Sequence, residues 1–168
     1  MWCCASRAPA DTVPVYRFYS PFLHSHFYTA GEDEALAVIE NYPDTWIFET
    51  VAFYALPADD VPDAQPVYRF WSPLLGEHFY TIRAGEANKL TEQFPDIWIP
   101  EGIAFYAFPE SSPPADTEPV YRFYNRHSGT HFYTGSVGEK DKLLNNFSDV
   151  WVLEGIAWYA YPPVSAVR

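Results

Sequence analysis

One aromatic-rich segment occurs three times along the chain, and this repetition constrains the fold more than any other feature. VYRFY begins at Val15, VYRFW at Val67 and VYRFY again at Val120, so the copies stand 52 and 53 residues apart. Each copy runs through HFYT to a Trp-led string: WIFETVAFYALP, WIPEGIAFYAFP or WVLEGIAWYAYP. Units repeated at such a period bury their apolar faces against one another. We therefore expect one domain of three repeats, residues 15–57, 67–109 and 120–162, between tails 1–14 and 163–168.

Each copy predicts the same order of elements. VYRFY and HFYT are short aromatic runs separated by a turn-prone segment, which is typical of a β-hairpin. The next segments, GEDEALAVIENY, AGEANKLTEQF and VGEKDKLLNNF, have early acidic residues and apolar residues at helical spacing, so each predicts one short helix. The Trp-led string predicts two more strands, with a tight turn or bulge at Gly102 and Gly155, where the first copy has Thr50. Each repeat is thus expected to be a β-β-α-β-β unit.

Three such units can close around an axis, which removes free sheet edges. Two all-β architectures with short helices fit: a β-trefoil, whose strands form a closed barrel, and a three-bladed propeller of four-stranded sheets. Propellers usually have about four to eight blades, so we favour a β-trefoil-like fold with pseudo-threefold symmetry. The helix between the second and third strands argues against it, because trefoil loops are usually short there.

The formal net charge of −12, from 22 acidic and 10 basic residues, argues against two classes of partner. A surface of that sign repels nucleic acids and anionic lipid headgroups. Membrane insertion is not expected, since the sequence has no apolar run of the length of a membrane helix. The first twelve residues contain no signal-peptide run, which leaves an extracellular or a cytosolic location open. Cys3 and Cys4 are adjacent and provide no disulfide framework.

Aromatic and polar positions both recur in all three copies. We expect the aromatic sets to form the core: Phe18, Phe70 and Phe123; Phe27, Phe79 and Phe132; Trp46, Trp98 and Trp151. The polar sets are Arg17, Arg69 and Arg122; His26, His78 and His131; Thr29, Thr81 and Thr134; Glu49, Glu101 and Glu154. One interpretation pairs each Arg with the Glu of its own repeat, as an internal clamp between the two hairpins.

The other interpretation places the polar groups at the mouth of a carbohydrate site with nearby tyrosines. A pyranose stacks its apolar C–H face on an aromatic ring, and its hydroxyls bond to polar side chains. His26 and Tyr28 lie two apart in one strand and therefore share a face. Three weak sites on one rigid body gain avidity for a multivalent glycan. The predicted ligand-binding residues are Tyr16, Arg17, His26, Tyr28 and Glu49; Tyr68, Arg69, His78, Tyr80 and Glu101; and Tyr121, Arg122, Asn125, His131, Tyr133 and Glu154.

Other kinds of site find less support. The sequence contains no nucleophile elbow, zinc-protease helix or phosphate loop, and one Glu per repeat supplies no carboxylate pair for glycoside hydrolysis. We therefore predict no enzyme and no cofactor. Three histidines converging on the axis would make a zinc site, but nothing in their spacing favours that arrangement. A protein-interaction or inhibitor scaffold, with structural Arg, His and Glu sets, is the alternative function.

The strings YRFYN, SGTHFYT and EGIAWYAYP of the third copy resemble an uncharacterised repeat family found in fungal lectin-like proteins and beside bacterial secreted and cell-wall enzymes. The resemblance covers the three copies and implies a module that binds glycans or cell-wall polysaccharide. The family pattern N-x-x-[ST]-G-x-H-F-Y-T is kept at Asn125, Ser128 and Gly129. The other two copies depart from it in the turn, so we expect the three sites to differ in strength.

Overall fold

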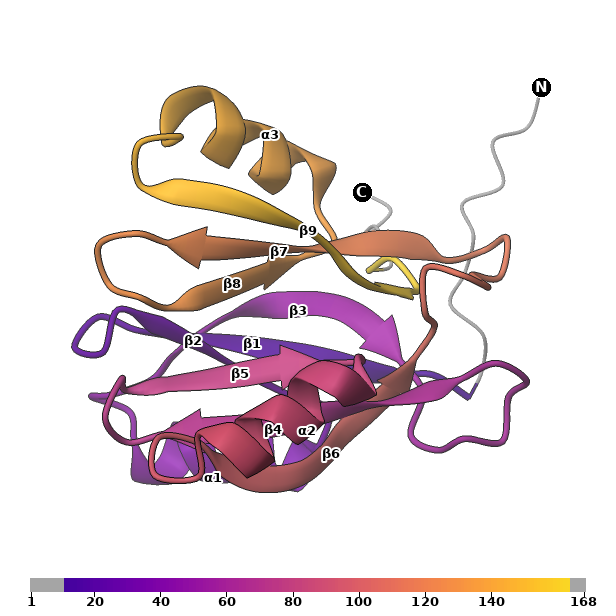
Figure 1. Ribbon diagram of the computed structural model, residues 1–168, viewed down its shortest axis with the longest axis horizontal. Coiled ribbons are helices and arrows are strands. Elements are labelled where there is room, and N and C mark those ends of the chain that lie inside the picture. The colour runs from indigo at the N-terminus through magenta and orange to yellow at the C-terminus, as the bar shows by residue number, and fades with distance from the viewer. Residues whose placement is uncertain (1–10, 164–168) are drawn as a thin grey trace.

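The computed structural model describes residues 11–163 and shows three consecutive β-β-α-β repeats (Figure 1). The first repeat contains β1 (Val13–Ser20), β2 (Ser25–Thr29), α1 (Glu32–Asn41) and β3 (Ile47–Ala55). The second contains β4 (Gln65–Ser72), β5 (Glu77–Thr81), α2 (Ala84–Gln93) and β6 (Ile99–Ala107). The third contains β7 (Glu118–Asn125), β8 (His131–Thr134), α3 (Val137–Asn146) and β9 (Trp151–Ala160). In these described residues, no helix has the length and apolarity to cross a membrane. Cys3, Cys4 and most of the two predicted tails lie outside the described residues.

The predicted hairpins and helices are confirmed. Antiparallel pairing sets Phe18 opposite Phe27 in the first hairpin, and the other two hairpins have the same register. Each helix follows its hairpin within the predicted segment and lies over one face of its own sheet (Figure 1). Ala35 of α1 is buried against Phe18 and Phe27, because a small side chain there lets the helix approach the sheet.

The prediction of a fourth strand in each repeat is wrong, because the Trp-led string forms one long strand instead of two. The positions predicted as a turn or bulge are bulges, with shifts in register between β4 and β6 and between β7 and β9. Gly102 and Gly155 take φ values of +91° and +124° at these bulges. Strand β3 carries the same irregularities around Thr50. A bulge absorbs extra residues and bends a strand without reversing it, so the chain continues in the same sheet.

Each repeat keeps its own three-stranded sheet, in the orders β2-β1-β3, β5-β4-β6 and β8-β7-β9. In residues 11–163 the strands form these three sheets and no closed barrel, so the trefoil barrel is a wrong expectation, although the all-β fold of three repeats is confirmed. Three sheets packed around an axis are closer to the propeller-like alternative. The third strands also close a ring of isolated bridges: Leu56 with Tyr106, Phe108 with Tyr159, and Tyr161 with Tyr54.

The main core surrounds the pseudo-threefold axis, and equivalent residues of the repeats meet there. The largest equivalent sets are Val15, Val67 and Val120; Tyr28, Tyr80 and Tyr133; and Phe53, Phe105 and Trp158. A satellite cluster lies under each of α1 and α2, and all six predicted core phenylalanines are buried. The predicted core tryptophans differ: Trp98 is 8% exposed, whereas Trp46 and Trp151 are only half-buried. These two predicted core tryptophans are therefore accessible at the surface.

Candidate functional site

Three predicted ligand-binding tyrosines, Tyr28, Tyr80 and Tyr133, form the centre of the core. They are at most 1% exposed. The Tyr80 hydroxyl accepts a hydrogen bond from the Tyr28 N–H at 2.8 Å and donates one to the Tyr28 carbonyl at 2.7 Å. The Tyr133 hydroxyl bonds Tyr80 in the same way, and the Tyr28 hydroxyl bonds Tyr133. Their strands are sheet edges, so these hydroxyls satisfy backbone groups that no neighbouring strand reaches. The prediction that these tyrosines contact a ligand is wrong.

The first tyrosines of the hairpins, Tyr16, Tyr68 and Tyr121, lie on the opposite face of each sheet. Adjacent strand residues point to opposite faces, so Tyr16 points away from the side that carries Arg17. Its ring lies 6.3 Å from that of Phe48, and both line a shallow groove of about 290 Å³ beside α1. These half-buried tyrosines are thus separated from the predicted Arg, His and Glu residues.

The Arg–Glu clamp predicted within each repeat is confirmed. Nε of Arg17 donates to Glu49 at 2.7 Å, Nε of Arg69 to Glu101 at 2.9 Å, and Nε of Arg122 to Glu154 at 2.7 Å. The terminal nitrogens of each Arg also bind both oxygens of a second carboxylate, which belongs to the helix of the preceding repeat. The pairs are Arg69 with Glu34, Arg122 with Glu86 and Arg17 with Glu139, at 2.8–3.0 Å. The clamps therefore join the repeats cyclically.

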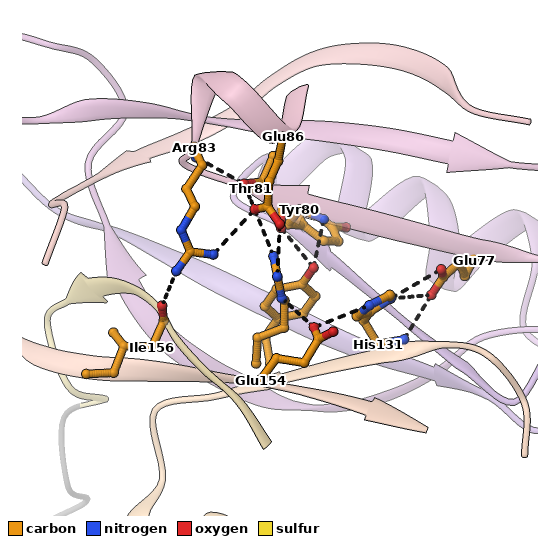
Figure 2. A network of polar contacts seen from close by, with 10 residues as sticks. Glu77, Tyr80, Thr81, Arg83, Glu86, His131, Glu154 and Ile156 are labelled. Atoms are coloured by element: carbon orange, nitrogen blue, oxygen red, sulfur yellow. Dashed lines mark hydrogen bonds and ion pairs between the residues drawn. The ribbon is translucent and has the colours of Figure 1, made fainter. Parts of the chain in front are cut away.

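The helix glutamates are the polar residues that sequence reasoning missed. They align in all three copies, and that recurrence was the available signal. Figure 2 shows the contacts of Glu86, whose carboxylate also accepts from Thr81 Oγ1 at 2.6 Å. Burial raises the pKa of Glu86, but donation from Arg122 and Thr81 outweighs burial and lowers this pKa to about 2. Four further carboxylates have lowered pKa values: Glu34, Glu49, Glu101 and Glu139. Burial alone would raise each pKa, but hydrogen bonds from Arg or His side chains outweigh burial.

The histidines lie beside these clamps at the three interfaces between repeats. Nε2 of His26, His78 and His131 approaches the clamp Glu of the same repeat at 3.2–3.5 Å. Each imidazole also packs on a phenylalanine of the preceding repeat, such as His78 on Phe27 at 4.8 Å between ring centres. Tyrosines occupy the axis, so the alternative of three histidines converging there on zinc is wrong. Among residues 11–163, no group of three or more His, Cys, Asp or Glu could hold a metal ion.

A groove of about 670 Å³ lies between repeats 1 and 2. We call it the Trp46 groove. Its aromatic lining residues are half-buried Trp46 and Trp71 and exposed Tyr42. Its charged and imidazole groups are Arg69, His78, Glu34 and Glu101, and Leu23, Phe27, Ala37, Val38 and Thr45 complete the lining. Three predicted site residues of the second repeat, Arg69, His78 and Glu101, therefore do meet at one accessible surface.

The interface between repeats 3 and 1 carries a differently lined pocket of about 400 Å³, which we call the histidine pocket. Its lining is Tyr19, His24, His26, Asn125, His127, Ser128 and Trp151. At the interface between repeats 2 and 3, buried Glu77 replaces the Ser25 and Thr130 of the other copies. Glu77 accepts from the His131 N–H at 2.9 Å, and both groups are labelled in Figure 2. The three interfaces thus share a clamp and differ in the side chains around it.

A family model described as "Domain of unknown function (DUF5648)" matches residues 2–108 and 97–167. The two overlapping matches fit a chain built from one repeated unit. Comparison with curated proteins and with solved structures gave no match.

Proposed function

We propose that this chain, which belongs to the family of that domain of unknown function, binds carbohydrate in the grooves between its repeats. The observation that carries the proposal is the Trp46 groove, where three accessible aromatic rings and a set of fixed charged groups line one surface. Its volume suits a small ligand or a short stretch of a polysaccharide. The binding residues proposed there are Trp46, Trp71, His78, Glu34 and Glu101.

The lining of the groove offers the two kinds of contact that a sugar ring makes. An indole offers a flat apolar surface to the C–H face of a pyranose. The Glu34 and Glu101 carboxylates keep free lone pairs beside their bonds to Arg69, and a carboxylate accepts strong hydrogen bonds from hydroxyls. Because Arg69 already fixes both carboxylates, a sugar would not have to order them on binding.

The charges of the groove support binding rather than catalysis. Glycoside hydrolysis needs one carboxylic acid with a raised pKa to protonate the leaving oxygen. The pKa values of Glu34 and Glu101 are instead lowered, because bonds from Arg69 and His78 outweigh the effect of burial. Both groups therefore stay ionised near neutral pH, where they accept hydrogen bonds and donate no proton.

The proposed partners are glycans or cell-wall polysaccharide, which agrees with the resemblance to fungal lectin-like proteins and to modules beside bacterial wall enzymes. Half-buried Trp151 offers an accessible indole between repeats 3 and 1 as well. Occupation of more than one groove would raise the avidity for a repeating polymer. Because the linings differ, we expect the three interfaces to differ in affinity.

Binding to an array of fungal and bacterial wall polysaccharides, followed by titration of the best oligosaccharide, tests this proposal. We expect Trp71→Ala and Tyr42→Ala to weaken binding about tenfold each, because each removes a ring from the groove. Phe22→Ala is the matched control, since Phe22 is 74% exposed and outside the lining of the groove. Thermal unfolding of every variant verifies that it folds. Unchanged affinity in both groove variants, or no glycan bound by the folded protein, would refute the proposal.

A protein-interaction or inhibitor scaffold is the second candidate, and exposed apolar turns favour it. Phe22 and Leu74 are 74% and 73% exposed at the tips of the first two hairpins. Large apolar side chains grouped at a surface mark contact sites more often than single ones do. Capture of a protein partner that competing sugars leave unchanged, and that Phe22→Ala and Leu74→Ala abolish, would favour this function.

A further inference from the structure

Three of the five histidines of the chain line the histidine pocket. His24 is exposed on the first hairpin turn, His127 is exposed on the third, and His26 reaches the pocket from β2. The repeat explains His26, which recurs in every copy, but His24 and His127 have no histidine counterpart in the other repeats. The pocket therefore contains two imidazoles that the fold itself does not require.

His24 occupies a backbone position at which the other repeats have glycine. Its φ is +51°, and the aligned Gly76 and Gly129 have φ values of +66° and +74°. This left-handed conformation is strained for a residue with a Cβ and free of strain for glycine. A histidine retained there at a cost in backbone energy points to a role for its side chain.

The two turns that carry the exposed histidines are fixed to each other. Thr130 Oγ1 donates to the His24 carbonyl at 2.8 Å, and its hydroxyl lies 2.7 Å from that of Ser128. Oδ1 of Asn125 accepts from the His127 and Ser128 N–H groups, which shapes the third turn. His24 and His127 therefore line a pocket of defined shape rather than two independent loops.

We propose that the histidine pocket binds the carboxylate of an acidic saccharide, such as a uronic acid, more tightly when its imidazoles are protonated. The inference rests on the proposed carbohydrate function. Trp151 and Tyr19 supply aromatic surface for the sugar ring, and imidazolium N–H groups donate charge-assisted bonds to the carboxylate. Histidine is the side-chain type that ordinarily changes charge between pH 5 and 8, so we expect the affinity for a carboxylate to depend on pH in that range.

The other charged groups around the pocket nearly cancel, so the charge of the pocket depends on its histidines. The elements around it carry five basic residues and six acidic ones: Arg17, Arg122, Arg126, Lys140 and Lys142, with Glu49, Glu118, Glu139, Asp141, Asp149 and Glu154. These bases and acids nearly cancel, and Arg17 directly bridges Glu49 and Glu139. The net charge of −12 acts at longer range and is largely screened beyond about 8 Å at physiological ionic strength. Protonated imidazoles thus dominate the local field at a bound carboxylate.

Calorimetric titration with trigalacturonic acid and with its methyl ester, at pH 5.5 and pH 7.5, tests the inference. We expect the acid to bind about tenfold more tightly at pH 5.5, and the uncharged ester to show no such change. His24→Gly and His127→Asn should each weaken binding of the acid about tenfold at pH 5.5. His24→Gly restores the residue of the other two repeats, so it preserves the turn.

Asp63→Gly is the matched control, because Asp63 is the other non-glycine residue of segment 11–163 with positive φ, at +68°, and lies in a linker. It should leave the affinity unchanged. Equal affinity at both pH values, insensitivity to His24→Gly, or binding that requires added Zn²⁺ would overturn the inference. Neutral glycan binding that is sensitive to Trp71→Ala, with no uronate binding, would overturn this inference alone. Absence of both kinds of binding would overturn the proposed function as well.

Discussion

Removing the hydroxyl of one of the three tyrosines at the axis tests whether these residues stabilise the domain through hydrogen bonds or only through packing. In Tyr80→Phe the ring keeps its contacts, which include Tyr28 at 5.4 Å and Tyr133 at 5.5 Å between centres. The hydroxyl that accepts from the Tyr28 N–H and donates to the Tyr28 carbonyl is lost. Two buried backbone groups are then left without their partner, and residues that are 0–1% exposed leave little access for water.

The magnitude follows from these two groups. A buried donor or acceptor left unsatisfied costs about 1–3 kcal/mol. We expect Tyr80→Phe to lower the free energy of unfolding by about 2–6 kcal/mol, with a fall in Tm of about 4–24 °C for a domain of this size. Tyr28→Phe and Tyr133→Phe should have similar effects, because each removes the equivalent pair of bonds.

Urea unfolding followed by circular dichroism, with a thermal scan, provides the measurement. Tyr42→Phe is the control, since Tyr42 is 57% exposed and should change stability by less than about 0.5 kcal/mol. The m-value should stay the same in both variants if only the native state is affected. A Tyr80→Phe protein as stable as Tyr42→Phe would refute the assignment of the hydroxyls as caps of the sheet edges.

Two further predictions concern the clamps and the bulges. The pKa of Glu86 is lowered from 4.5 to about 2, so its contribution to stability is present above pH 4.5 and is lost as the pH falls from 4.5 to 2. Glu86→Gln should therefore lower the free energy of unfolding by about 1–2 kcal/mol at pH 7, a value that allows for solvent screening because the carboxylate is 33% exposed. Urea titrations should show that the difference in stability from the wild type shrinks as the pH falls towards 2. Gly155→Ala should lower the free energy of unfolding by about 1–3 kcal/mol, because φ is +124° there while an added Cβ meets open space. A stable Gly155→Ala, or a Glu86→Gln difference that does not depend on pH, would contradict these accounts.

The elements that are local in sequence could be predicted from it. Hairpin and helix depend on patterns within about a dozen residues, and the Arg17–Glu49 clamp was visible as a pair of recurring opposite charges. The Trp-led string was ambiguous, because a glycine between two aromatic runs marks either a turn or a bulge. The structure contains the bulge, so one strand replaced the two that were expected.

The contacts between repeats could not be predicted in the same way. A tyrosine has an apolar body and a polar tip, and both a core and a sugar site use that combination. Only the packing of three sheets around an axis decides that Tyr28 is a core residue and that Trp46 is accessible. The partner of Arg69 was missed for a related reason, since Glu34 lies in another repeat and pairs with it only after closure.

The internal repeat separates what the fold needs from what function can vary. Arg69 and its equivalents bind one carboxylate within the repeat and one from the helix before it, so a change at any of the three would open an interface. The hairpin turns carry no clamp residue, and no position of theirs is the same in all three copies, which read SPFLHS, SPLLGE and NRHSGT. His24 and Ser128 come from these turns and line the histidine pocket, while Leu23 lines the Trp46 groove. Shared clamps thus fix the positions of the sites, and the divergent turns give each site its own chemistry.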